Sequence, residues 1–351
     1  MKVLCAMSGG VDSSVAAIEL LEAGHEVVGV TMRLWGGESD TGCCSIADVD
    51  DARRVAQHLG IDHVVFNFTD DFDRHVVDPY IAAHAAGTTP NPCIECNRHL
   101  KFDRLLERAD LLGFDAVATG HHARIVTVDA RRHVARGADS AKDQSYVVHM
   151  LDQAALARTL FPVGHLTKAQ VRDRASASGL RTAAKPDSQD VCFITHTGGR
   201  ESFLGARIPF RPGTVVDTDG AVVGSVESVE MVTIGQRRGL GLPGGSPKRY
   251  VVDVDVERAV VVVGDETTQF TDVVDLDGLV WAAEPVEGEV LVQCSAHGEA
   301  RRAELVGTRV RFAEPQRRVA PGQSVVVYDI TDQFVLGGGV AARRATSSAH
   351  R

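Results

Sequence analysis

The stretch Met7–Ser14, M-S-G-G-V-D-S-S, limits the possible folds of this chain more than any other feature. It follows the apolar run Val3–Ala6 and precedes the helical pattern that begins at Val11. A buried strand, a glycine turn and a helix in this order bring backbone N–H groups and a helix N-terminus to one point. Gly9 and Gly10 let the backbone approach a ligand closely. The stretch therefore predicts a phosphate-binding loop.

Polar side chains in this loop add to the prediction. Ser8, Ser13 and Ser14 offer hydroxyl donors, whereas Asp12 is unusual beside an anion. We expect Asp12 either to hold Mg²⁺ or to cap the helix. No lysine follows the glycines, so the loop differs from the G-x-x-x-x-G-K-[ST] loop of ordinary phosphoryl transferases. A polar turn without a ligand remains the alternative.

Length and composition set the broad class of protein. The 351 residues predict two or three domains, and 44% hydrophobic residues suffice for real cores. No apolar run approaches the roughly 20 residues that span a bilayer. Seven cysteines, an odd number at uneven spacing, argue against a secreted disulfide framework. We expect a cytoplasmic protein with no membrane segment. The net charge of −10 argues against nonspecific nucleic-acid binding but allows a local basic surface.

The first 195 residues alternate between strand and helix patterns. The predicted strands are Lys2–Met7, Glu26–Met32, Asp62–Phe68 and Asp115–Thr119; the predicted helices are Val11–Glu22, Ala47–Leu59, Cys96–Leu112, Ser145–Leu151 and one that opens at the capping box Thr167–Gln170. Strands separated by helices predict an α/β fold with a parallel sheet and helices on both faces.

After about residue 200 the pattern becomes all-β. Residues 213–224 form a hairpin pattern with an Asp-Gly turn, and short strand patterns continue to Tyr328. We expect two small β domains that resemble barrels. The predicted division is 1–200 for an ATP-binding catalytic domain, 201–268 for a central β domain, 269–345 for a C-terminal β-barrel domain and 346–351 for a disordered tail.

Six further motifs narrow the function. They are T-P-N-P-C-I-E-C-N-R-H-L-K-F (89–102), G-A-D-S-A-K-D-Q-S-Y (137–146), D-S-Q-D-V-C-F-I (187–194), T-I-G-Q-R-R-G-L-G (233–241), P-G-Q (321–323) and L-G-G-G (336–339). The S-G-G-V-D-S-S loop resembles that of the ATP pyrophosphatase superfamily. Together with that loop, the six motifs resemble the tRNA-specific 2-thiouridylases of the MnmA type, in order and over nearly the whole chain.

The resemblance implies a reaction and its participants. ATP, accompanied by Mg²⁺, would adenylate the 2-oxygen of the wobble uridine in a tRNA anticodon loop, and a cysteine persulfide would then deliver sulfur. A cysteine desulfurase or a sulfur-relay protein would load the persulfide. The implied fold is a nucleotide-binding α/β domain followed by two β domains that hold tRNA.

The resemblance also assigns residues. Cys96 matches the nucleophile and Cys192 the persulfide carrier. The ATP-binding positions are Ala6, Met7, Ser8, Gly9, Gly10, Val11, Asp12, Ser13, Met32 and Gly120. The positions that contact the target base or the tRNA are Asn91, Pro92, Cys93, His121, Lys142, Asp143, Gln144 and Gln323.

The chemistry of the cysteines agrees with this assignment. Exchange of oxygen for sulfur needs an activated oxygen and a soft sulfur nucleophile, and a thiol beside a helix start has a lowered pKa. We expect the helix to begin at Asn97, directly after Cys96. A persulfide on Cys192 can be resolved by Cys96 through a disulfide, so the two thiols must meet in space.

Other roles for these cysteines stay open. Cys93-x-x-Cys96 also has the spacing of a zinc site, to which His121 and His122 could contribute. Cys93, Cys96 and Cys192 could instead hold an iron–sulfur cluster, because many members of the family have aspartate where this chain has Cys93. Two alternative functions also remain for the whole chain. It could be an amino-acid ligase of the same superfamily, or a nucleotide-sensing RNA-binding module.

One departure from the family concerns the last domain. The family often has an Arg-Tyr pair that reaches tRNA, but the corresponding strand here reads V-Q-C-S-A-H-G (292–298). Those contacts cannot be transferred to this chain.

Overall fold

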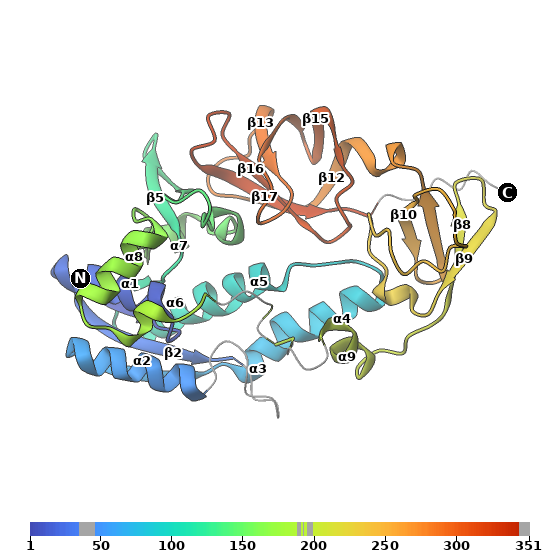
Figure 1. The fold of residues 1–351 in the computed structure, drawn as a ribbon. Helices are drawn as coiled ribbons and strands as arrows, with labels where there is room; N and C mark the ends of the chain where they lie inside the picture. The colour runs from blue at the N-terminus through green and yellow to red at the C-terminus, as the bar shows by residue number, and fades with distance from the viewer. Residues whose placement is uncertain (35–45, 188–190, 192, 195–198, 344–351) are drawn as a thin grey trace.

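The computed structural model describes residues 1–34, 46–187, 191, 193–194 and 199–343 (Figure 1). The predictions for Cys192 and for the tail 346–351 therefore lie outside the described residues.

A five-stranded parallel sheet forms the centre of the N-terminal domain. Its order is β3-β2-β1-β4-β7, with β1 Lys2–Ala6, β2 Glu26–Arg33, β3 His63–Asn67, β4 Ala116–Ala118 and β7 Thr159–Leu160. Every neighbouring pair in it is parallel, which confirms the predicted sheet.

Side chains of β1 alternate between two hydrophobic clusters, one on each face of the sheet. Val3 and Cys5 join a cluster with α1, α2 and α8, whereas Leu4 and Ala6 join one with the helices between residues 69 and 111. The helices of the domain are α1 Val11–Glu22, α2 Ile46–Leu59, α3 Thr69–Phe72, η1 Asp73–Val77, α4 Asp78–Ala85, α5 Pro92–Glu95, η2 Cys96–Arg104, α6 Leu105–Leu111, η3 Ser145–Val148, α7 Gln153–Ala157, α8 Lys168–Ala177, η4 Arg181–Ala184 and α9 Gly199–Gly205. The expectation of helices on both faces is confirmed (Figure 1).

The helical run that carries Cys96 begins earlier than predicted. Asn91 is its N-cap and accepts a hydrogen bond from the backbone N–H of Cys93 at 3.0 Å, and Pro92 occupies the first helical position. The run continues through the π-helical segment η2 into α6. The predicted start at Asn97 is wrong, because the Asn-Pro pair already provides the cap and the first turn.

A hairpin that the sequence analysis did not predict leads away from the sheet. Strands β5 Ala123–Val128 and β6 Arg131–Arg136 pair antiparallel across a turn in which Asp129 and Ala130 have positive φ. Ala135 forms a bridge to Phe334 of the C-terminal barrel. The hairpin therefore joins the N-terminal domain to the barrel.

Two β units follow, as expected. The first is a four-stranded sheet of order β10-β11-β8-β9, with β8 Gly213–Asp217, β9 Val222–Val226, β10 Tyr250–Asp255 and β11 Val260–Gly264. The second is a closed barrel of order β12-β15-β14-β13-β16-β17, with β12 Phe270–Trp281, β13 Gly288–Gln293, β14 Arg301–Val306, β15 Arg309–Arg317, β16 Ser324–Tyr328 and β17 Val335–Ala341. Short helical turns η5 Val229–Met231 and η6 Thr267–Gln269 complete this half. The proposed domain bounds remain predictions.

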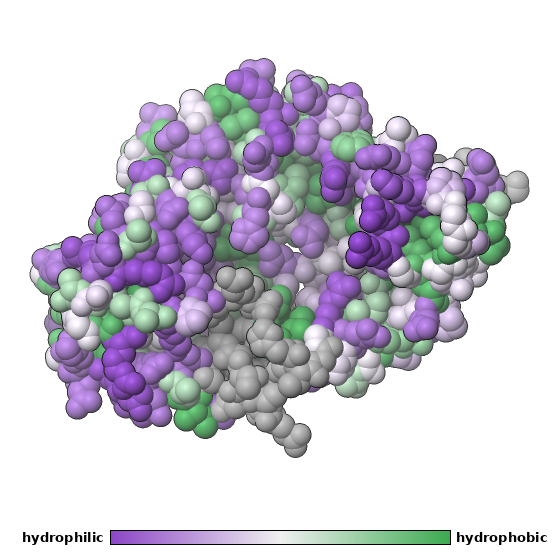
Figure 2. Space-filling view, viewed as in Figure 1, coloured by the Kyte–Doolittle hydropathy of each residue, from purple (hydrophilic) through white to green (hydrophobic). Residues whose placement is uncertain are grey.

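The barrel lies above the helices of the first domain, and the surface between them is hollowed (Figures 1 and 2). Arg343, after the last barrel strand, donates to the carbonyls of Ala86 and Val254 and so touches both other units. Among the described residues, no helix has the length and apolar character needed to cross a membrane.

Candidate active site

The glycine loop joins the end of β1 to the start of α1, in the strand–turn–helix order that the sequence predicts. Gly9 has φ of +73°, and a Cβ at this position would clash with the backbone carbonyl of Asp48. Gly10 is the N-cap of α1 and provides no side-chain cap. Ser13 Oγ accepts from the N–H of Ser8 at 3.2 Å, which closes the loop on itself. The expectation that Asp12 caps the helix is therefore not met.

Two other predicted ATP positions lie close to the loop. A Cβ on Gly120 would lie 2.6 Å from the backbone nitrogen of Ser13, so only glycine allows the chain after β4 to pass this closely. Met32, near the end of β2, is buried in the same cluster as Ala6. The carboxyl ends of β1, β2 and β4 thus meet around the loop, which is the edge where open α/β sheets bind ligands.

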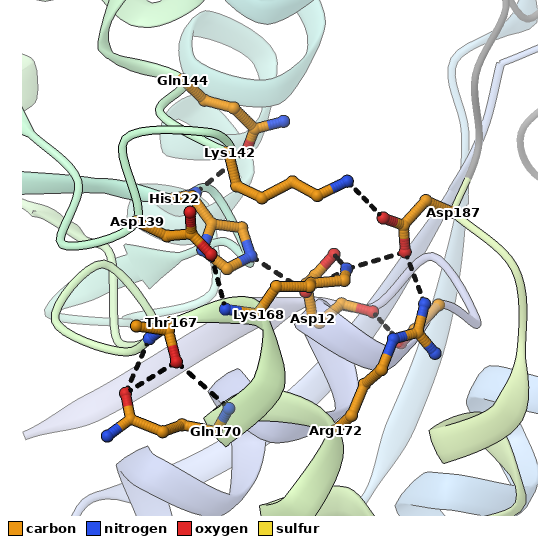
Figure 3. Close-up of polar contacts among 12 residues, drawn as sticks. Asp12, His122, Asp139, Lys142, Gln144, Thr167, Lys168, Gln170, Arg172 and Asp187 are labelled. Atoms are coloured by element: carbon orange, nitrogen blue, oxygen red, sulfur yellow. Dashed lines mark hydrogen bonds and ion pairs between the residues drawn. The ribbon is translucent and has the colours of Figure 1, made fainter.

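Asp12 pairs with two cationic or potentially cationic side chains (Figure 3). Lys168 Nζ lies 2.7 Å from both of its carboxylate oxygens, and His122 Nε2 lies 3.0 Å from Oδ1. Burial alone would raise the pKa of Asp12, but hydrogen bonds from His122 and Lys168 outweigh it and lower the pKa. Asp12 is therefore an anion in the loop.

A second carboxylate extends this network. Asp187 pairs with Lys142 at 2.8 Å, with Lys168 at 2.8 Å and with Arg172 at 2.9 Å (Figure 3). Burial opposes ionisation, yet the hydrogen bonds from Lys142 and Lys168 dominate and lower the pKa of Asp187 to about 2. Gln144 Oε1 accepts from the backbone N–H of His122 at 2.9 Å. Two predicted tRNA contacts, Lys142 and Gln144, thus belong to the same network as the loop.

The sequence analysis missed Lys168, Asp187 and Arg172 as site residues. Lys168 lies inside the capping box Thr167–Gln170, which was read only as a helix start, and Asp187 opens the motif that contains Cys192. Their partners lie up to 156 residues away, so no local pattern connects them.

Two other predicted tRNA contacts are engaged inside the protein. Asp143 binds Arg136 at 2.9 Å, the N–H of Gly137 at 2.7 Å and the hydroxyl of Ser145 at 2.7 Å. His121 is buried with its Nδ1 2.6 Å from the hydroxyl of Thr119. Burial, with smaller contributions from Lys101 and His122, holds the pKa of His121 well below its usual value. Contact of either side chain with RNA remains a prediction.

Cys96 is buried against one face of the parallel sheet. It belongs to the hydrophobic cluster that contains Ala6 and Met32, two of the predicted ATP positions. Phe193 is in the same cluster and packs edge-on against Phe72 and Tyr80, with ring centroids 5.6 and 5.4 Å apart. Residue 193, next to the predicted persulfide carrier, is therefore anchored in the cluster that holds the predicted nucleophile.

The predicted target-base residues lie at the N-terminal end of α5, and Cys96 is the C-cap of that helix. Asn91 caps it, Pro92 is buried and Cys93 is exposed. The side-chain amide of Gln323, from the barrel, donates to the carbonyl of Thr89, and the N–H of Thr89 donates to the carbonyl of Pro321 at 2.9 Å. A cavity of about 330 Å³ opens here between the helix and the barrel, lined by His75, Pro79, Ala83, Thr88, Pro90, Asn91, Glu95, His99, Gly322, Ser324 and Val340.

Metal-binding alternatives have limited support. Within the described ranges, no three His, Cys, Asp or Glu side chains are grouped so as to hold a metal ion. The third cysteine of the iron–sulfur alternative, Cys192, lies outside those ranges.

Three family models match successive parts of the chain. They are described as a tRNA methyl transferase HUP domain (residues 1–196), a tRNA methyl transferase PRC-barrel domain (201–265) and an aminomethyltransferase beta-barrel domain (280–341). The order of these matches is the order of the three β-sheet units described above.

Curated relatives match almost end to end. The tRNA-specific 2-thiouridylase MnmA of Chloroflexus aurantiacus is 48% identical over 360 residues, which cover 97% of this chain and 98% of the relative. The enzyme of the same name from Mycobacteroides abscessus is 47% identical over 365 residues, covering 98% and 100%. That of Symbiobacterium thermophilum is 45% identical over 363 residues, covering 97% and 92%.

Proposed function

This chain belongs to the family of MnmA-type tRNA-specific 2-thiouridylases, and we propose that it replaces the 2-oxygen of a tRNA wobble uridine with sulfur. The observation that carries the proposal is the position of Cys96. It shares one buried cluster with Ala6 and Met32, which flank the glycine loop. This shared cluster supports a site in which a base bound near Cys93 and Cys96 would lie between the nucleotide and the sulfur nucleophile.

The reaction that fits this arrangement has two stages. In the first, the 2-oxygen of the uracil attacks the α-phosphorus of ATP, the bond between the α-phosphorus and the bridging oxygen breaks, and pyrophosphate leaves with the electron pair. In the second, the terminal sulfur of a Cys192 persulfide attacks C2 of the base and AMP leaves. The Cys96 thiolate then attacks Cys192 Sγ, which releases the thiolated base and leaves a Cys96–Cys192 disulfide for an external thiol to reduce.

The loop residues fit ATP with Mg²⁺. We assign Ala6–Ser13, Met32 and Gly120 to the nucleotide, with loop N–H groups and the start of α1 facing its phosphates. Mg²⁺ is usually bound by one or two carboxylates together with substrate phosphates, and Asp12 is an ionised carboxylate in this position. When bound, the ion would offset negative charge on the phosphates.

The tRNA side of the proposal rests on the opening between the α5 helix and the barrel. A wobble uridine lies in a single-stranded loop, so it can be turned out of the stack and inserted into a pocket. Asn91, Pro92 and Cys93 would contact that base, and Lys142, Gln144 and Gln323 would contact the tRNA. His121 and Asp143 would act from inside the protein. A cysteine desulfurase or a sulfur-relay protein would supply the sulfur, in the cytoplasm.

A single assay tests this function. The protein is incubated with ATP, a sulfur donor and unmodified tRNA, and both 2-thiouridine and AMP are measured, in wild type and in Cys96→Ser. We expect one AMP for each 2-thiouridine in wild type and no 2-thiouridine in the variant.

Other results would indicate one of the alternative functions. AMP release that needs an amino acid instead of tRNA would indicate a ligase. Binding of ATP and tRNA without AMP release would indicate a binding module. Iron and sulfide in anaerobically purified protein would favour the cluster route.

A further inference from the structure

The cavity of about 330 Å³ between α5 and the barrel is separate from the two cysteines of the helical run beside it. Neither Cys93 nor Cys96 is among the described residues that line the cavity, although both lie on the run that starts at Asn91. Asn91 itself borders the cavity, and so do the two neighbours of Gln323 in the barrel. The cavity therefore lies next to the expected position of the target base and has room for a second group.

Contacts between the barrel and the segment before α5 fix one wall of this cavity. The N–H of Thr89 donates to the carbonyl of Pro321 at 2.9 Å, and the amide of Gln323 donates to the carbonyl of Thr89. Gly322 lies between these bonds with φ of +88°, and a Cβ there would lie 3.3 Å from both Thr88 Cβ and the Thr89 nitrogen. The cavity is therefore preformed, as small-ligand sites usually are, and its volume is within their range of about 300 to 1,000 Å³.

Two histidines provide an aromatic surface in the cavity. The rings of His75, on η1, and His99, on η2, are stacked with centroids 4.8 Å apart and planes inclined by 28°, and both residues border the cavity. His99 Nε2 lies 3.3 Å from Glu95, and its Nδ1 lies 3.2 Å from Asp103, so both edges of the ring are held by the same helical run. Unstacked RNA bases stack on histidine as they do on other aromatic side chains. The pair is therefore a fixed platform for a planar group.

The rest of the lining suits the faces and edges of a nucleobase. Apolar surface comes from Pro79, Ala83, Pro90 and Val340. Asn91 Oδ1 accepts from the N–H of Cys93 at 3.0 Å, so the amide NH₂ of Asn91 is the group that can donate to a ligand, and the carboxylate of Glu95 can accept. A base has apolar faces and carries both donors and acceptors on its edges. A phosphate fits less well, because the described lining contains no lysine or arginine.

We propose that this cavity binds a nucleobase adjacent to the target uridine in the same anticodon loop, with His75 and His99 as its stacking platform. This inference rests on the proposed function. When the target base is turned out of a single-stranded loop, the neighbouring base loses a stacking partner. The histidine pair replaces that partner close to Asn91, where the target base is expected. The cavity thereby offsets part of the cost of unstacking the loop.

The test combines changes in the tRNA with changes in the protein. Full-length tRNA transcripts carry an abasic nucleotide directly before or directly after the wobble uridine, and their Kd is measured by fluorescence anisotropy at one salt concentration. We expect one of the two abasic positions to weaken binding to wild type about 5- to 100-fold, the range of one base–aromatic stack. In the double variant His75→Ala/His99→Ala, intact tRNA should bind correspondingly more weakly, and the same abasic nucleotide should change the Kd less than threefold. The double variant His75→Phe/His99→Phe keeps two aromatic rings and should retain most of the affinity.

His165→Ala is the matched control, because His165 is an exposed histidine that pairs with Glu19 of α1 and is not part of the cavity lining. This variant should bind every transcript like wild type. The inference is overturned if neither abasic position weakens binding to wild type, or if the abasic nucleotide weakens binding to wild type and to the double alanine variant equally. Formation of 2-thiouridine by wild type on the intact transcript, with ATP and a sulfur donor, tests the proposed function separately. Its absence would contradict that function, whereas normal thiolation without any effect of the abasic nucleotides would contradict only the present inference.

Discussion

The guanidinium carbon of Arg136 lies 3.7 Å from the centre of the Tyr328 ring, which joins the β5–β6 hairpin to the barrel. The same guanidinium also donates to Asp143 at 2.9 Å, to Gln293 at 2.7 Å and to Asp332 at 2.7 Å. Asp143 directly follows Lys142, which pairs with Asp187 beside the glycine loop. One largely buried arginine therefore connects the barrel to the polar network of the nucleotide site.

Replacement of Arg136 should weaken this connection. We expect Arg136→Met to lower the free energy of unfolding by about 3 kcal/mol, because it leaves Asp143 without a charged partner in a partly buried site. Urea unfolding measures the loss. Arg131→Met is the control, because its pair with Glu284 joins the same hairpin to the barrel region but is exposed, and we expect a change below about 0.5 kcal/mol. Equal losses in both variants would contradict the role given to Arg136.

The conformation of Gly9 should be essential for nucleotide binding. Gly9→Ala places a methyl group against the carbonyl of Asp48 at φ of +73°, so the loop must move away from its anion-binding shape. We expect binding of α,β-methylene-ATP to be lost in calorimetry. Gly24→Ala is the control, since Gly24 has φ of +77° with open space around it. That variant should lose only about 1 kcal/mol of stability and keep its nucleotide affinity. Retained binding by Gly9→Ala would contradict the loop assignment.

The pairs of Asp187 should make stability depend on pH in the acid range. Its pKa is lowered from the ordinary 3.8 to about 2, so folding favours the ionised form. The resulting stabilisation is fully present above about pH 4 and is lost as the pH falls towards 2. We expect wild type to exceed Asp187→Asn by about 1 kcal/mol at pH 6, since solvent screens part of the interaction, and by almost nothing at pH 2.

Urea unfolding of both proteins across this range measures the effect. In a Lys142→Met background the difference should become smaller, because one of the cations that lowers the pKa is gone. A difference that stays constant from pH 6 to pH 2 would show that Asp187 acts through its shape and not through its charge.

The sequence predicted those parts of the fold that depend on local pattern. The alternation of Val3, Leu4, Cys5 and Ala6 between two faces follows from a strand buried on both sides, and the bounds of α1 were predicted correctly. The six-stranded barrel was only partly predicted. The strand β17 contains Gly337–Gly339, a run unfavourable for strands, yet a Cβ on Gly338 would lie 2.6 Å from the ring of His149. Close packing against the N-terminal domain explains Gly338, whereas Cβ atoms on Gly337 and Gly339 would clash with the backbone of the neighbouring strand β12. No local pattern reveals either approach.

The candidate site, like the fold, was predicted only where its residues form a local sequence pattern. The glycine loop and the cysteine motifs are contiguous in sequence, so both could be recognised. Lys168 and Asp187 form part of the site only because α8 and the segment after η4 fold back onto α1. The missed start of the Cys96 helix has a different cause, because Asn91 and Pro92 were considered only as contacts of the target base and not as a helix cap.

The central claim is that Cys96 and Cys192 meet at a base activated through the glycine loop. Its most direct test is a single turnover of persulfide-loaded protein with ATP and tRNA, without added thiols, followed by peptide mass spectrometry and nucleoside analysis. We expect a Cys96–Cys192 disulfide in an amount equal to the 2-thiouridine formed, and neither product without ATP. Formation of 2-thiouridine while Cys96 remains a reduced thiol would contradict the account.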